Sequence, residues 1–293
     1  MTTAALPLPL TLDRDALARN IRALPSLPTV VQELLALMQA QEADIDRIGT
    51  TLSQDQALSA RVLQLANSPL YGLSGRIASI RDGIKILGLR QLGSLVLTAA
   101  VTLQFERLHG QSLHMETFWR HSMACAVAAQ HLARHVGLDE ASAFTAGLLH
   151  DVGRLVLDSR YPNEMAQVLR WARAQDMCLC QAEQALLGID HTEVGQWMAR
   201  HWRFAPQVVE AIGQHHEPPP SGAVTLIDVV HGADAIAHAL DIALHDAEAV
   251  PPVNGWSWQR LQWHTGALVP TLQAIELEFQ TLQAILRPIP EAV

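Results

Sequence analysis

Hydrophobic residues recur every three or four positions along most of the chain, which is the spacing of one face of an α-helix. The segments 28–38 and 58–66 follow this spacing, as does 226–240. Strict alternation of apolar and polar residues, which would indicate strands, is almost absent. The run from Leu92 to Phe105 is the most apolar, but it is too short to span a bilayer and contains four polar residues. The pattern predicts an all-α fold in which 92–105 is a core helix.

Residue types at several helix ends support this interpretation. Asp139 precedes "EASAFTAGLLHDVGRLVL" and is the expected N-cap of that helix. Asp190 and Glu193 have capping-box spacing at the start of "HTEVGQWMARHW". Gly137 is the expected end of the helix that contains "FWRHSMACAVAAQHLARHV".

Composition narrows the classes of function. Among 293 residues, 49% are hydrophobic and 17% are charged, as in a packed globular protein. The net charge of −9 argues against broad nucleic-acid binding, which needs a surplus of Lys and Arg. Three cysteines without a CxxC pair, and a start without a signal-peptide pattern, predict a cytoplasmic protein with no membrane segment.

The stretch "GLLHDVGRLVL" places His150 and Asp151 side by side in an apolar helical run. Burying two titratable groups is costly unless they are paired. Imidazole and carboxylate ligands suit Fe, Mn or Zn, and an Asp can bridge two metals about 3.5–4 Å apart. The alternative is that these and the other histidines are hydrogen-bonded core residues. No close HxxxH or HxH pair decides between the two interpretations.

Longer motifs carry a family resemblance. The amino-terminal part contains "LPSLPTVVQELL", "QDQALSARVLQLANSPLYG" and "IASIRDGIKILGLRQLGSLVL". The later part contains "FWRHSMACA", "AFTAGLLHDVGRLVL", "LGIDHTEVGQWMARHW" and "IGQHHEPPP". Over roughly Leu24 to Leu240 the chain resembles the HDOD proteins, the HD-related output domains of the HD phosphohydrolase superfamily. Gln56 stands where the family usually has Pro.

The resemblance implies a two-lobed helical fold and a set of metal ligands. Residues matching the HD ligands, and the further histidines of the HD-GYP cyclic di-GMP phosphodiesterases, are His121, His150, Asp151, His191, His215, His216 and Asp234. The implied cofactor is a mononuclear or dinuclear centre of Fe, Mn or Zn. Arg154 and Glu217 are expected to line the pocket beside it.

Two departures from the HD-GYP pattern affect catalysis. Where those enzymes carry a Gly-Tyr-Pro loop, this chain reads "PPPSGAV" after Glu217, and a common Lys is replaced by Arg154. An Arg keeps the charge but has a planar fork and a different pairing geometry. Both changes fall where a nucleotide phosphate would be held, so we assign no catalytic residue.

The expected domains are an amino-terminal helical lobe over 1–110, an HD-like lobe over 111–245, and a Pro-rich connector with a helical tail over 246–293. In the tail an apolar stripe either docks on the domain or forms a homodimer contact; its residues are Leu272, Ile275, Phe279, Leu282 and Leu286.

The resemblance implies a bacterial signalling role, often within cyclic di-GMP networks. We expect a regulatory protein that acts through a signalling partner, bound by the amino-terminal lobe around Leu24 to Tyr71. The alternatives are a metal-dependent phosphohydrolase or phosphodiesterase acting on a cyclic nucleotide, and a sensor that binds a nucleotide without turnover.

Overall fold

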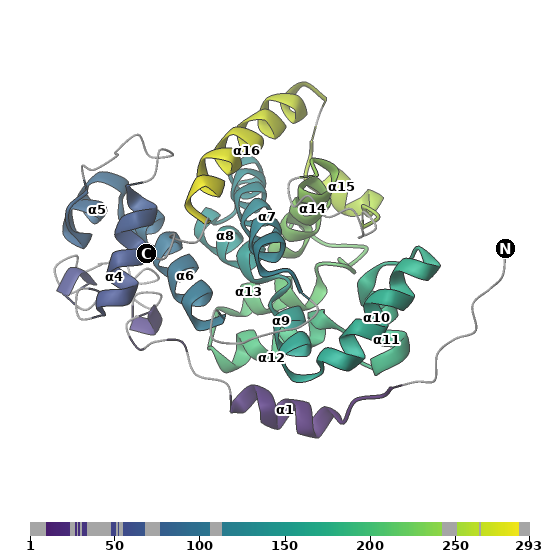
Figure 1. The fold of residues 1–293 in the computed structure, drawn as a ribbon. Coiled ribbons are helices and arrows are strands. Elements are labelled where there is room, and N and C mark those ends of the chain that lie inside the picture. Colours follow the sequence, from purple (N-terminus) through teal and green to yellow (C-terminus); the bar gives the residue numbers. More distant parts are fainter. Residues whose placement is uncertain are drawn as a thin grey trace. The chain divides into compact units, whose positions relative to one another are not determined.

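The computed structural model describes residues 10–23, 27, 29, 31–33, 48–50, 52, 55–67, 77–105, 113–241, 251–263 and 265–286. Throughout these ranges the regular elements are helices, without a strand, which confirms the all-α prediction (Figure 1). The expected helix over 28–38 and the expected partner surface around Leu24 to Tyr71 fall largely outside them. Among the helices described, none is long and apolar enough to cross a membrane.

The chain divides into two compact units. The smaller unit comprises residues 25–108 and 274–293, and the larger comprises 1–24 and 109–273. The first 24 residues thus group with the larger unit, although the sequence boundary near residue 110 placed them in the amino-terminal lobe. The reason is a long-range pairing, because the backbone N–H groups of Leu10 and Leu12 donate to the carbonyls of Leu186 and Leu187 at 2.8 and 2.9 Å.

The smaller unit contains α4 (Gln56–Ala66), α5 (Ile80–Leu87) and α6 (Leu89–Phe105), each in contact with the other two. The apolar face of α4 is buried at Leu58 and Val62, and α6 is buried from Leu92 to Val101, as a core helix should be. The side chain of Asn67 bonds the backbone N–H and carbonyl of Ile77 at 3.0 and 2.7 Å.

The larger unit is built from most of the remaining helices: α1 (Arg14–Arg22), α7 (Met115–Val136), α8 (Glu140–Leu149), α9 (Val152–Arg160), α10 (Pro162–Gln175), α11 (Leu179–Leu187), α12 (His191–His201), α13 (Pro206–Gln214), α14 (Leu226–Ala239) and α15 (Gly255–Arg260). The boundary between the two units falls after residue 273, inside the last helix, α16 (Thr265–Leu286). Its residues Ile275 and Phe279 are buried within the chain.

Two expected caps are present. Asp139 accepts the N–H of Ser142 at 2.7 Å at the start of α8, and Asp190 accepts the N–H of Glu193 at 3.0 Å at the start of α12. The Glu193 side chain pairs with Arg14 on α1. Because Asp190 fixes the first turn of α12, His191 becomes the first residue of that helix.

Two glycines allow the helices around His150 and Asp151 to approach closely. A Cβ on Gly153 would lie 2.0 Å from the carbonyl oxygen of His191, so α9 touches the start of α12. A Cβ on Gly147 would lie 2.8 Å from the carbonyl oxygen of Cys125, so α8 touches α7. These contacts bring the α8–α9 junction between α7 and α12.

Candidate metal centre

Seven side chains from six helices or helix ends converge in the larger unit. Each of the seven residues expected as metal ligands belongs to this group: His121 lies on α7, His150 ends α8, Asp151 precedes α9, His191 begins α12, His215 and His216 follow α13, and Asp234 lies on α14. Six of them are at most 5% exposed, and His216 is partly exposed.

One half of the cluster surrounds His121 and His150. Nε2 of His121 lies 3.1 Å from Oδ1 of Asp234 and 3.2 Å from Nε2 of His150. Nε2 of His150 lies 3.6 Å from Oδ2 of Asp151 and 3.8 Å from Oδ1 of Asp234. Two imidazoles and two carboxylates therefore face a common space.

The other half is formed by three histidines around Asp151. Nε2 of His191 lies 3.2 Å from Oδ1 of Asp151 and 3.1 Å from Nε2 of His216. Nε2 of His215 lies 3.9 Å from the same Asp151 oxygen. Asp151 thus turns one oxygen to each half, which is the arrangement of a carboxylate that bridges two metals.

Three of the histidines are held from behind through Nδ1. Nδ1 of His150 donates to the Gly147 carbonyl at 2.8 Å, and Nδ1 of His215 donates to the Ile212 carbonyl at 2.9 Å. Nδ1 of His191 donates to the Glu183 carboxylate at 2.6 Å. For His150 and His215, whose pKa values are lowered, the bond places the proton of the neutral ring on Nδ1 and leaves the Nε2 lone pair facing the cluster, as in metal-binding histidines. The bond from Nδ1 likewise turns Nε2 of His191 toward the cluster, where a metal would have to displace its second proton.

These atoms fit a divalent metal. Nε2 of His215 is buried without a hydrogen-bond partner, which is costly unless a cation binds there. Ligand atoms lie within 4.8 Å of one another in four overlapping groups of three: His191, His215 and His216; His121, Asp234 and His238; His121, His150 and Asp151; and His150, His215 and Asp234.

Burial and neighbouring charges favour the forms that bind metal. Burial lowers the pKa of His150 and His215, and lowers that of His216 to about 4, so these rings stay neutral. Burial opposes the charge of Asp151, but His150 and Arg154 outweigh it and hold its pKa well below the usual value.

Neighbouring side chains shift the pKa values of Asp234 and His191 against the effect of burial. Burial opposes the charge of Asp234, but bonds from His121 and His238 outweigh it and keep its pKa well below the usual value. Burial also opposes the charge of His191, but Glu183 outweighs it and raises the pKa of His191 to about 9.

Sequence reasoning missed two members of the site. His238 is one helical turn after Asp234, and its Nε2 lies 3.4 Å from Oδ1 of Asp234, where it offers a further imidazole. The i, i+4 spacing was a signal that could have identified it. Glu183 is fully buried behind His191, and its signal was a lone acidic residue in the apolar run "AEQALL".

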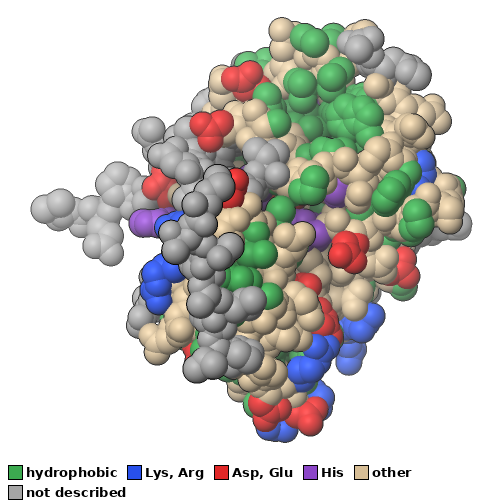
Figure 2. Space-filling model, turned by 90° about the vertical axis from the view of Figure 1, so that its right-hand side faces the viewer, with side chains coloured by type: hydrophobic (Ala, Val, Ile, Leu, Met, Phe, Trp, Pro, Cys, Tyr) green, Lys and Arg blue, Asp and Glu red, His purple; other side chains and the backbone are tan. Residues whose placement is uncertain are grey.

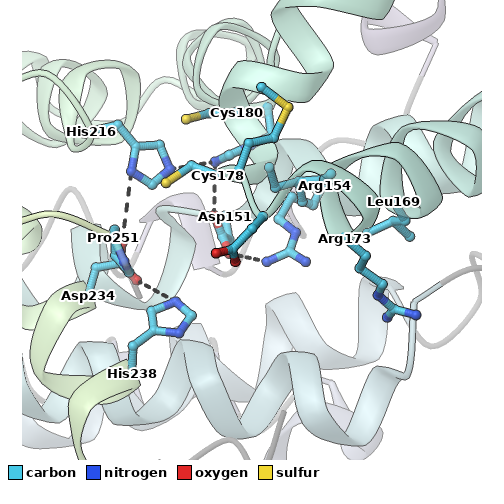
Figure 3. Close-up of a pocket in the computed structure, with 15 residues that line it drawn as sticks. Asp151, Arg154, Leu169, Arg173, Cys178, Cys180, His216, Asp234, His238 and Pro251 are labelled. Atoms are coloured by element: carbon cyan, nitrogen blue, oxygen red, sulfur yellow. Dashed lines mark hydrogen bonds and ion pairs between the residues drawn. The ribbon is translucent and has the colours of Figure 1, made fainter. Parts of the chain in front are cut away.

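A cavity of about 390 Å³ opens onto the cluster (Figure 3). Besides Asp151, Asp234 and three histidines, its walls include Arg154, Arg173, Cys178, Cys180 and Pro251. Nη1 of Arg154 bonds Oδ2 of Asp151 at 2.9 Å. Glu217, also expected here, is exposed and is not among the lining residues. Figure 2 shows histidine side chains near the middle of the face it presents.

Two cysteines lie in the cavity wall, although the sequence offered no CxxC pair. Cys178 and Cys180 are partly exposed and line the cavity. Burial, followed by Glu183, raises the pKa of the Cys180 thiol to about 12. Cys180 therefore stays a neutral thiol, which is the form least suited to bind a metal.

Comparison with solved structures finds the same fold over nearly the whole chain. A candidate phosphohydrolase from Shewanella amazonensis is 28% identical with a TM-score of 0.74, and the match covers 92% of this chain and 98% of that one. An HDOD domain protein from Geobacter sulfurreducens is 28% identical with a TM-score of 0.78, covering 94% and 100%.

Sequence comparisons find relatives that match part of this chain. An uncharacterised protein of Treponema pallidum is 25% identical over 231 residues, which are 77% of this chain and 44% of that protein. Ribonuclease Y of Thermus thermophilus is 33% identical over 134 residues, 45% of this chain and 18% of the enzyme. The chain therefore matches less than half the length of either relative. The family model of the HDOD domain matches residues 24–218.

Proposed function

Because the chain belongs to the HDOD family, we propose that it is a signal-transduction protein whose larger unit binds a divalent metal centre of Fe, Mn or Zn. It acts through protein or ligand binding, with little or no turnover. The observation that supports the metal centre most directly is the buried, unpartnered Nε2 of His215 among converging ligand atoms.

The candidate ligands form two groups on either side of Asp151, which would serve both. His121, His150 and Asp234 would hold one ion, and His191, His215 and His216 would hold the other. Bound metal would supply Lewis acidity and lower the pKa of a bound water. Arg154 keeps Asp151 ionised and oriented through their 2.9 Å bond.

Elemental analysis tests the metal centre. We expect the purified protein, or protein reloaded with Fe, Mn or Zn, to hold one or two ions per chain, and His215→Ala to hold fewer. His114→Ala is the matched control, because His114 is exposed at the start of α7. A wild-type chain that stays metal-free after reloading would remove the proposal.

The loop after His216 supports the absence of efficient turnover. Three consecutive prolines, Pro218 to Pro220, offer no backbone N–H to a phosphate. The loss of a single oxyanion-type donor typically costs about 100- to 1,000-fold in rate. We therefore expect no appreciable hydrolysis of cyclic di-GMP with added Mn or Fe.

A phosphohydrolase is the second candidate. It is favoured by the guanidinium groups of Arg154 and Arg173 in the cavity wall, because they suit a phosphate. The test measures turnover of cyclic di-GMP and of bis(p-nitrophenyl) phosphate, with Mn or Fe, in the wild type and in His150→Ala. Robust turnover that His150→Ala abolishes would establish this candidate. Nucleotide binding without turnover would indicate a sensor.

We propose the smaller unit as the surface that binds a signalling partner. Within it, Ile86 on α5 is a large apolar side chain that is 48% exposed. Recovery of a partner with the tagged full chain should fall in Ile86→Asp and persist in His150→Ala. The reverse pattern would place the partner contact at the metal lobe.

A further inference from the structure

His231 connects the ligand loop to a segment beyond the family match. It is buried on α14, one turn before Asp234. Its Nδ1 lies 2.7 Å from the carbonyl oxygen of His215, and its Nε2 lies 3.0 Å from the backbone N of Asn254. Because the Asn254 N–H can only donate, Nε2 carries the lone pair. Nδ1 therefore carries the proton and donates to His215.

Residues 254–260, which we call the α15 clamp, also bond the loop directly. The indole N–H of Trp256 donates to the carbonyl of Pro218 at 3.2 Å, and Nη2 of Arg260 donates to the carbonyl of Pro219 at 2.8 Å. Together with the bond through His231, these contacts fix three carbonyls between residues 215 and 219. Prolines cannot fix such a loop through their own N–H groups, so the bonds to their carbonyls replace that restraint.

The α15 clamp is itself anchored to the first turn of α14. Asp228 is fully buried, and its Oδ1 accepts hydrogen bonds from Ser257 at 2.7 Å and from Nε of Arg260 at 3.0 Å. Its Oδ2 accepts the N–H of Thr225 in the capping box at 2.9 Å. Asp228 thus ties the α15 clamp to the helix that carries Asp234 and His238.

We propose that the α15 clamp positions His215 and His216 through His231, so that a segment outside the family match at 24–218 sets how tightly the centre holds its ion. The effect on metal affinity rests on the proposed function. His231 is a positioning residue, because it contacts the backbone of one ligand and binds no ion itself.

Cobalt(II) loading of the full chain tests the proposal through affinity and visible absorption, which reports the ligand geometry. Substitution of residues that orient metal ligands costs about 10- to 100-fold in affinity. We expect His231→Ala to weaken Co(II) binding about 10-fold and to change the spectrum. His231→Gln should recover part of both, because its amide can donate to His215 and accept from Asn254. Gln259→Ala, at an exposed position of α15, should match the wild type.

Amide hydrogen exchange over residues 213–217 of the metal-free chain gives a second readout. We expect faster exchange in His231→Ala and in Trp256→Phe, which keeps an aromatic ring but lacks the N–H donor. Gln259→Ala should not change it. If the wild type bound no Co(II), the proposed metal centre would fail while exchange still tested the α15 clamp. Unchanged exchange in both variants, or unchanged Co(II) affinity and spectrum in a loaded His231→Ala, would overturn the inference.

Discussion

Oε2 of Glu183 lies 2.6 Å from Nδ1 of His191 and also accepts the backbone N–H of the same residue at 2.8 Å. Both side chains are buried, so these hydrogen bonds take the place of the water that would otherwise stabilise the carboxylate. The pair fixes the ring of His191 with Nε2 toward Asp151. A carboxylate that orients a ligand histidine in this way also increases its basicity.

Glu183→Gln keeps the shape of the side chain and removes its charge. We expect metal affinity to fall about 10- to 100-fold, because the orientation and basicity of His191 are reduced. Titration with Zn or Mn under a competing chelator measures this change. Glu210→Gln on the exposed side of α13 is the control. Equal affinities for the wild type and Glu183→Gln would show that Glu183 is only a packing residue.

The same pair predicts a loss of stability at alkaline pH in the metal-free protein. The pKa of His191 is raised from 6.5 to about 9, so its contribution is fully present below about pH 6.5 and is lost as pH rises through about 9. A shift of this size corresponds to about 3 kcal/mol. Denaturant unfolding between pH 6 and 10 measures it. Glu183→Gln should flatten this part of the profile, and an unchanged slope would contradict the assignment.

Metal removal should lower the melting temperature. An ion that binds only the folded chain adds about 2.7 kcal/mol to its stability at 100 times the dissociation constant. We expect a chelator to destabilise the wild type and His114→Ala, and to have little further effect on His150→Ala. Differential scanning fluorimetry with and without chelator gives the comparison. Identical melting of the wild type in both conditions would favour an ion-free, hydrogen-bonded cluster.

Gly153→Ala should disrupt the contact between α9 and α12. The added Cβ would lie 2.0 Å from the carbonyl oxygen of His191, and backbone cannot yield as a flexible side chain can. Overpacking typically costs about 1–3 kcal/mol and here should reach at least the upper end. Denaturant midpoints measure the loss. Gly266→Ala, whose Cβ meets nothing within 4 Å, should be neutral or slightly stabilising. Equal midpoints for the two variants would refute the close approach.

Hydrophobic periodicity and N-cap residues predicted the helices well, because both signals depend only on residues that are near one another in the sequence. Asp139 and Asp190 cap the helices that they were expected to cap. The candidate ligand set came from family resemblance, since spacing alone did not favour a metal site over hydrogen-bonded core histidines. The structure brings those residues together through helix contacts that depend on Gly147 and Gly153.

The parts that sequence reasoning did not anticipate depend on long-range backbone contacts. Residues 1–24 group with the larger unit because Leu10 and Leu12 bond the end of α11, and no periodicity encodes that pairing. Glu217 follows His215 and His216 in sequence, yet it turns to solvent while Cys178 and Cys180 reach the cavity. Adjacency along a chain does not fix the direction of a side chain after a helix ends.

The spread of the proposed ligands from α7 to α14 also sets an order of events during protein synthesis. A growing chain carries His121 early, but Asp234 and His238 leave the ribosome only when α14 is made. A site shared among so many helices cannot pre-exist in an incomplete chain, so ion capture by the proposed centre would follow translation of the lobe. The α15 clamp emerges after α14, and nascent chains that end before it would release an ion of the proposed centre most readily.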